Sequence, residues 1–422
     1  MKIIQYKIGC ISLIFLLSNI FLSCKSQNGN YLIERNILHQ NRNAIVQGDL
    51  ELNQALELLI VQADSVLKVP IRTVIQKKQM PPSNDKKDYL SLGQYWWPDP
   101  RKPDGLPYIR RDGKTNPEFS KVTDNSYMRQ MSSNVRLLAV AYYYTNNERY
   151  ARKAAEQLRA WFLDSKTGMN PNLNHAQYIP GVNDGRSEGI IDTRVLVSTI
   201  DGAKLLVGSS SWTSQDEQEL KNWFSKYLNW LQTSDLGKGC SRYKNNIGTA
   251  YYMQLIGYAV FSDNKELAKR IIKNKVYQLL EYQIDNEGKQ PEELKRANSW
   301  NYTIANLNYW FRIAQLAETV NIDLWNYRTA SGKSIRSAYE WCLPYATNNA
   351  KWGYEQNKKI DFSNSFSSLR ARGDRKFSSS SIRMSNLRNK QSSARETNAE
   401  ASTTERIRGG SINAFEILTG GN

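Results

Sequence analysis

Aromatic rings, amides and arginines concentrate in long stretches of the chain that show neither a helical nor a strand period. In one of them, Tyr95, Trp96 and Trp97 stand side by side before Pro98. Such a cluster either plugs a core or offers flat faces on which sugar rings stack. Long irregular stretches inside a helical chain are commonly functional. Four qualify here, at residues 81–125, 167–189, 233–244 and 286–301.

The second stretch adds groups that can hold hydroxyls and carboxylates. His175 and Gln177 lie among several asparagines, and Arg186 follows after a Pro-Gly turn. A lone histidine is more often structural than catalytic. No pair of carboxylates suited to glycoside hydrolysis stands in these stretches. The whole chain has two histidines and four cysteines without a cluster, which predicts no zinc site and no other metal or cofactor.

The last two stretches each end where a helix is expected to begin. Asn245 and Asn246 open one such helix, and the amino end of a helix favours anions. Arg296 and Tyr302 flank the start of the other helix and could share one pocket. These residue types suit a reaction that neutralises a carboxylate and removes a proton from the neighbouring carbon.

Apolar residues recur at spacings of three and four through most of the chain, which predicts an all-α fold. An N-terminal helical region is expected at residues 31–78, followed by four helical hairpins. Ser211 or Thr213 can cap the second helix of the second hairpin. The eight helices are predicted at residues 126–144, 150–162, 190–206, 215–231, 246–261, 265–282, 303–320 and 334–345.

Both ends of the chain differ from this helical body. Residues 1–24 carry a basic start and a fifteen-residue apolar run before Ser23-Cys24, which is typical of a bacterial lipoprotein signal peptide lipidated at Cys24. An ordinary signal peptide is the alternative. Residues 361–422 contain 13 Ser and no Trp, Tyr or Cys, so we expect a disordered tail after a domain at 25–360.

The net charge of the chain indicates what kind of binding partner to expect. Lys and Arg number 57 against 40 Asp and Glu, a net charge of +17, of which about +11 falls on the predicted domain. This suits a polyanion in an exported, periplasmic or outer-membrane-anchored protein. Export argues against nucleic acid, and the only membrane contact expected is the lipid at Cys24. We expect a monomer, and Cys240 and Cys342 could be free thiols or a disulfide.

Residues 89–356 resemble the alginate lyase superfamily of bacterial polysaccharide lyases. The resemblance rests on Leu92–Pro100, Trp161–Asp164, Met169–Gln177, Gly189–Asp192, Asn245-Asn246, Arg296 with Asn298-Ser299 and Tyr302, and Asp323–Trp325. It implies an (α/α) toroid, or incomplete barrel, with a cleft across one end. It also implies β-elimination of alginate or a related polyuronate, in which a neutralised carboxylate acidifies the C5 proton.

The resemblance assigns roles to individual positions. Tyr302 is the implied base and acid, Asn246 the neutraliser, and Arg296 lowers the pKa of Tyr302 or holds the carboxylate. Ile247 stands where the family has His, and an isoleucine transfers no proton. The protein is therefore expected to be a weak lyase or, alternatively, an inactive polyuronate-binding descendant. The expected substrate contacts are Asn245, His175, Gln177, Arg186, Trp97 and Tyr251.

Overall fold

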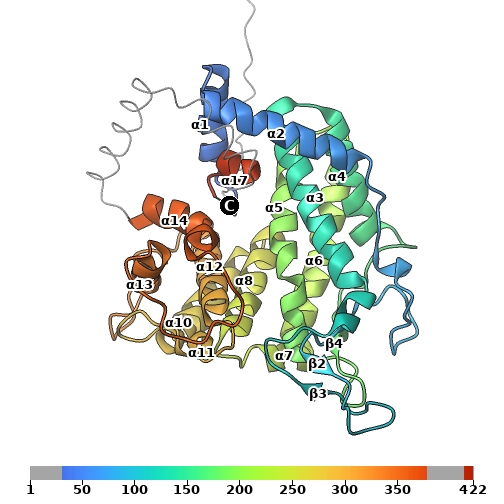
Figure 1. Ribbon diagram of the computed structural model, residues 1–422. Helices are drawn as coiled ribbons and strands as arrows, with labels where there is room; N and C mark the ends of the chain where they lie inside the picture. Colours follow the sequence, from blue (N-terminus) through green and yellow to red (C-terminus); the bar gives the residue numbers. More distant parts are fainter. Residues whose placement is uncertain (1–30, 378–412, 422) are drawn as a thin grey trace, which may run out of the picture.

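The computed structural model describes residues 31–377 and 413–421 and consists almost entirely of helices (Figure 1). The predicted helices are confirmed, with ends that move by a few residues. The α-helices are α1 (Arg35–Val46), α2 (Leu50–Leu67), α3 (Asp124–Thr145), α4 (Glu148–Leu158), α5 (Leu196–Leu205), α6 (Ser214–Thr233), α7 (Asp235–Cys240), α8 (Asn246–Phe261), α9 (Lys265–Ile271), α10 (Tyr277–Gln283), α11 (Pro291–Leu294), α12 (Ser299–Glu318), α13 (Ile335–Ala346), α14 (Phe362–Phe377) and α17 (Ala414–Thr419).

Three predicted helices contain segments of other helical types. The helix expected at 150–162 ends in a π-helical turn, η3 (Arg159–Leu163), and the one at 265–282 is divided by a second, η5 (Ile272–Val276). The helix expected at 190–206 begins as the 3₁₀ segment η4 (Ser187–Val195) before α5. Two more 3₁₀ turns, η1 (Val74–Gln76) and η2 (Pro117–Lys121), lie in the long N-terminal connection.

Successive helices pack as neighbours around a shared core. Helix α3 contacts both α4 and α5, and α8 contacts α6, α9 and α12. Helix α8 is the most enclosed, since every residue from Gly248 to Phe261 is buried. Thr213 caps α6 in a reciprocal bond with Asp216, as its sequence position predicts, whereas the hydroxyl of Ser211 binds Glu148.

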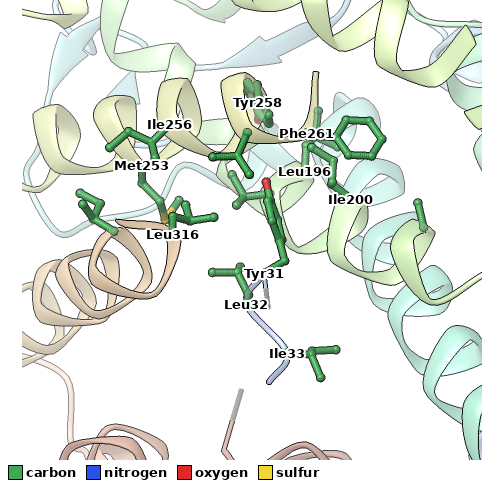
Figure 2. Packing of buried hydrophobic residues seen from close by; sticks show 14 of the residues in the cluster. Tyr31, Leu32, Ile33, Leu196, Ile200, Met253, Ile256, Tyr258, Phe261 and Leu316 are labelled. Atoms are coloured by element: carbon green, nitrogen blue, oxygen red, sulfur yellow. The ribbon is translucent and has the colours of Figure 1, made fainter. Parts of the chain in front are cut away.

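The first described residues of the chain, beginning at Tyr31, lie inside this core. Tyr31, Leu32 and Ile33 insert among α5, α8 and α12, where they contact the group of apolar residues drawn in Figure 2. The Tyr31 hydroxyl donates to the Gly257 carbonyl at 2.8 Å, and Asp201 accepts the amides of Leu32 and Ile33. Through these hydrogen bonds the segment connects the C-terminal halves of α5 and α8.

Short strands gather at the opposite end of the molecule, where α8 and α12 begin (Figure 1). Strand β1 (Leu90–Leu92) pairs in parallel with β4 (His175–Tyr178), and β2 (Trp96–Trp97) pairs antiparallel with β3 (Ile109–Arg110). The Lys77 ammonium and the Asp124 carboxylate lie 2.9 Å apart, both fully buried, and join this region to the start of α3. The stretches expected to be loops at 233–244 and 286–301 contain α7 and α11.

The expectation of an unpacked tail from residue 361 is wrong for the described part of that segment. Phe366 and Leu369 of α14 are buried, and the Phe366 ring stacks on Tyr339 of α13. Helix α17 packs on α2 and buries Leu418. The serine-rich composition of the segment gave no indication that these few apolar residues would be buried. Residues 378–412 lie outside the described residues, so that part of the expectation stays a prediction.

Cys240 and Cys342 are both buried free thiols, which decides the alternative that the sequence left open. Burial raises the pKa of each thiol well above its usual range. Among the described helices, none is both long and apolar enough to cross a membrane.

Candidate active site

A pocket of about 640 Å³ opens between the strand-bearing loops and the first turns of α8 and α12. Its wall carries three carboxylates, Glu188, Asp192 and Glu292. Seven cationic side chains outnumber them, and this excess gives the pocket a positive field suited to an anionic ligand. These cations are Arg110, Arg129, Arg186, Arg194, Lys295, Arg296 and Lys358.

The Tyr302 hydroxyl lies in this pocket between two hydrogen-bonding partners. Arg296 Nη2 donates to it at 2.9 Å, and the hydroxyl of Tyr95 lies 3.0 Å away. The Arg296 guanidinium also covers the Tyr302 ring, with its carbon 3.8 Å from the ring centroid. Asp112 holds the other side of Arg296 at 2.9 Å. Arg296 and Tyr95 therefore hold the phenol directly, and Asp112 holds Arg296 in place.

Burial raises the pKa of Tyr302 above its ordinary value, and the hydrogen bond with Tyr95 acts in the same direction. The positive charge of Arg296 opposes this effect, as the sequence predicts, but does not overcome it. Without ligand, Tyr302 is therefore a protonated phenol at neutral pH. In that state it can donate a proton, and it needs assistance to accept one.

Asn246 lines the same pocket and is fixed by a buried carboxylate. Its backbone amide and its side-chain Nδ2 each donate to one oxygen of Glu293, both at 2.6 Å. Glu293 is 1% exposed, and burial raises its pKa to about 7 despite these two bonds. An ionised carboxylate only accepts, so Nδ2 is the end of the amide that faces Glu293. Its second hydrogen is left for another acceptor.

The carboxyl group of Glu293 already occupies the amino end of α8. Asn245 caps the helix by accepting from the Ile247 amide, while Glu293 occupies the amide of Asn246. The sequence predicted an anion preference here, and this internal carboxylate satisfies it. Asn245 and Ile247 both line the pocket, and Ile247 also packs against the apolar core.

Gln177 and Arg186, both predicted to contact substrate, lie together in a second polar wall of the pocket. The Arg186 guanidinium donates to the Gln177 side-chain oxygen at 2.8 Å, and the Gln177 amide donates to Asp192 at 3.0 Å. Gln177 adopts a φ of 50°, a left-handed conformation that is uncommon outside glycine. Its amide hydrogen bonds to Ser91 and to Asp192 hold it there.

Three residues predicted to contact substrate lie outside the pocket wall. His175 is buried, its Nδ1 is 3.2 Å from the Asp184 carbonyl and its Nε2 is 4.0 Å from Asp88, so it braces a loop. The Trp97 indole donates to the Lys114 carbonyl. The hydroxyl of Tyr251 donates to the Leu231 carbonyl inside the core. The polar groups of all three side chains thus have partners within the protein.

The sequence missed several groups that the fold brings to the pocket. Tyr95 belongs to the aromatic run, yet Trp97 was the ring chosen from it. Asp112 is 184 residues from Arg296, and nothing in the sequence links the two. Glu293 stands three residues before Arg296, a spacing that places both near one helical turn and could have identified it. Arg129, Arg194 and Tyr309 face the pocket from helices that were taken only as core.

Within residues 31–377 and 413–421, no three His, Cys, Asp or Glu side chains come together as metal ligands. Cys24 lies outside the described residues, and its predicted lipidation stays a prediction.

Helix pairs in a ring with a cationic pocket across one end define an (α/α) toroid protein. The alginate lyase family model matches residues 73–352, and the chain belongs to this family. An alginate lyase from Bacteroides ovatus shares 33% identity with a TM-score of 0.80, over 93% of this chain and 99% of that one. Alginate lyase A1-III from Sphingomonas species A1 shares the fold at 17% identity and a TM-score of 0.54, over 81% and 87% of the two chains. The search of curated proteins gave no match.

Proposed function

We propose that this protein cleaves a uronic-acid polysaccharide, alginate or a related polyuronate, by β-elimination. The single observation that carries the proposal is the Tyr302 hydroxyl, held by Arg296 and Tyr95 in the same cationic pocket as Asn246. A variant of alginate lyase A1-III has been solved in complex with a tetrasaccharide, at 16% identity and a TM-score of 0.51.

The chemistry follows from the placement of these groups. The free Nδ2 hydrogen of Asn246 and the surrounding cations would take up charge from the C6 carboxylate, which makes the C5 proton more acidic. Tyr302 must first lose its own hydroxyl proton to solvent, and the resulting phenolate, stabilised by the Arg296 guanidinium, would then remove the C5 proton. The C5–H electrons then form the C4=C5 double bond as the C4–O4 bond breaks, and the proton on Tyr302 passes to O4. One tyrosine serves both steps only when both atoms lie on the same face of the sugar.

Ile247 sets the expected rate of this reaction. It lines the pocket beside Asn246, where the family pattern has His, and an aliphatic side chain neither donates nor accepts a proton. An anti-elimination needs groups on both faces of the ring, so Ile247 would remove one of them. We therefore expect slow turnover, restricted to uronates whose C5 hydrogen and O4 leave from the same face.

A second candidate function is binding of the same polymer without cleavage. It is favoured by Ile247 together with the raised pKa of Tyr302, because both reduce the number of groups ready to accept a proton. The cationic pocket would still attract and hold a polyuronate. The two candidates share a ligand class and differ only in chemistry.

The experiment is a panel of mannuronan, guluronan and glucuronan, followed by the absorbance of the unsaturated product and, in parallel, by calorimetric binding. Cleavage predicts absorbance that grows with time and falls by about a hundredfold or more in Tyr302→Phe, since a positioned acid–base group contributes ~10²–10⁴-fold. Binding should survive in that variant. Binding without absorbance would support the second candidate, and neither signal on any polymer would overturn both.

We further propose that the protein is exported and anchored by a lipid on Cys24. The support is the sequence pattern at residues 1–24. Metabolic labelling with a radioactive fatty acid should mark the wild-type chain, and Cys24→Ser should abolish the label and release the protein from the membrane fraction. Labelling that persists in Cys24→Ser would contradict the proposal.

A further inference from the structure

The inner faces of two helices, α3 and α12, continue below the candidate active site and carry arginines. On α12, Tyr302 and Tyr309 line the pocket. Arg312 follows three residues after Tyr309 and therefore lies on the same face of the helix. On α3, Arg129 lines the pocket, and Arg136 lies two turns further on, about 10 Å along the axis. Both helices begin at the pocket end, so both arginines lie deeper in the ring.

Arg312 and Arg136 have few partners at this depth. Arg312 donates to the Ser198 hydroxyl on α5 at 3.0 Å. Arg136 covers the Phe415 ring of α17 at 4.7 Å, and its Nε is buried without a hydrogen-bond partner. A third arginine, Arg372 of α14, is 3% exposed and donates to Asn308 at 2.7 Å. Three helices, α3, α12 and α14, thus direct guanidinium groups toward one region.

No carboxylate of the described chain lies within ion-pair distance of these three guanidinium groups. Asp201 and Glu416 are the acids whose charges act on them, yet neither lies within 4.0 Å of any of the three. Asp201 already accepts two backbone amides through one oxygen, and its other oxygen has no partner. Burial raises the pKa of both acids, which weakens them further as counter-ions.

The arginines also act on one another. Burial and mutual repulsion lower the pKa of Arg312 to about 10 and that of Arg372 to about 9. Burying cations without partners is costly, so such a cluster persists where something else supplies negative charge. Arg136 and Arg312 are each only partly buried, so solvent reaches part of each residue.

We propose that Arg136, Arg312 and Arg372 form an internal binding site for a small oxyanion, beneath and separate from the candidate active site. Guanidinium groups match the oxygens of phosphate, sulfate or a carboxylate through paired hydrogen bonds. The anion could be a free inorganic ion or the carboxylate of a single uronic acid. Both present the same chemistry to the site.

The test is equilibrium dialysis of the full chain with radiolabelled inorganic phosphate at constant ionic strength. We expect one saturable site, with binding about tenfold or more weaker in Arg136→Gln and in Arg312→Gln, because a hydrogen bond to a charged group is worth about 1.5–3 kcal/mol. Arg152→Gln, which changes an exposed arginine of α4, should bind as the wild type does. Competition by sulfate against competition by glucuronate distinguishes the two sources.

A control separates this site from the pocket above it. Arg296→Gln alters the pocket and should leave phosphate binding intact. Loss of binding in Arg296→Gln with retention in Arg136→Gln would overturn the proposal, as would the absence of saturable binding. Should the Gln variants fold poorly, thermal unfolding decides instead. Phosphate should raise the unfolding midpoint of the wild type in proportion to occupancy and leave that of Arg136→Met unchanged.

Discussion

A single side chain, Ile247, separates the two functions that this pocket could perform. It packs against the core and lines the pocket next to Asn246. Its backbone amide is held by the Asn245 cap, so a substitution there changes the side chain without disturbing the start of α8. The position is therefore well suited to adding a missing proton-transfer group.

Ile247→His should raise the rate of elimination by about a hundredfold, within the range contributed by a general acid or base. The measurement is the initial rate of absorbance increase on the best polyuronate of the panel. Ile247→Val is the matched control, since it keeps the apolar contact and should leave the rate unchanged. Ordinary turnover of the wild type, about 1–10³ s⁻¹, with no gain from His would show that this position lies outside the chemistry.

Glu293 gives the protein a stability that depends on pH. Its pKa rises from 4.5 in the unfolded chain to about 7 in the folded one, so the folded state prefers the protonated acid. Stability is unaffected below the unfolded pKa, falls as pH rises between the two values and is lowest above about 7. The full difference is about 3 kcal/mol, at about 1.4 kcal/mol per pH unit.

Denaturant unfolding of the wild type and Glu293→Gln should therefore give curves that diverge across that pH range. The free energy of unfolding of the wild type should fall by about 3 kcal/mol relative to the variant between pH 4.5 and 7.5. Glu292→Gln is the control, because its carboxylate pairs with Lys295 at the surface. Parallel curves for wild type and Glu293→Gln would mean that the buried carboxyl keeps an ordinary pKa.

At the scale of elements, α14 supports the helix that carries Tyr302. Its Phe366 ring packs on Trp300, in the first turn of α12, and the Trp300 indole donates to the Ser365 hydroxyl at 2.9 Å. The segment that sequence composition assigned to a tail is thus part of the foundation of the site.

Phe366→Ala should lower the free energy of unfolding by about 3–4 kcal/mol, the usual cost of removing a buried phenyl ring. Denaturant titration followed by tryptophan fluorescence measures the change. The neighbouring exposed Ser367 provides the control, and Ser367→Ala should change stability little. An equally small effect of Phe366→Ala would restore the interpretation of this segment as an unpacked tail.

Regular elements were predictable because the apolar period that defines a helix is local. Helix α8 was predicted with its observed ends. Arg296 and Tyr302 were expected in one pocket because they flank the start of a helix, and the family resemblance added Asn246. The partners that tune them were not predictable. Tyr95 meets Tyr302 only through tertiary packing across 207 residues. The contacts that the His175 and Tyr251 side chains make with backbone carbonyls were not predictable either, because they cannot be read from residue type.

At the scale of the whole molecule, charge should control encounter with substrate. A net charge of +17 and a pocket lined by seven cations would attract a polyanion over distances of a Debye length. We expect the affinity for polyuronate to fall by about tenfold from low salt to physiological salt, as measured by calorimetry. A carboxyl-reduced polymer serves as control and should bind weakly at both. Salt-independent binding of the polyuronate would show that contacts other than charge dominate.

The entry of the chain at Tyr31 has a consequence for how the molecule would stand on a membrane. Tyr31 is fixed beside Gly257, toward the end of α8, whereas the pocket lies at the beginning of that helix. With a lipid on Cys24, only the six residues 25–30 would separate the anchor from Tyr31, and these seven steps along the chain span at most about 25 Å. So short a connection would keep the Tyr31 end of the protein next to the bilayer. The mouth of the pocket, at the other end of α8, would then face away from the membrane, where long polymer chains arrive.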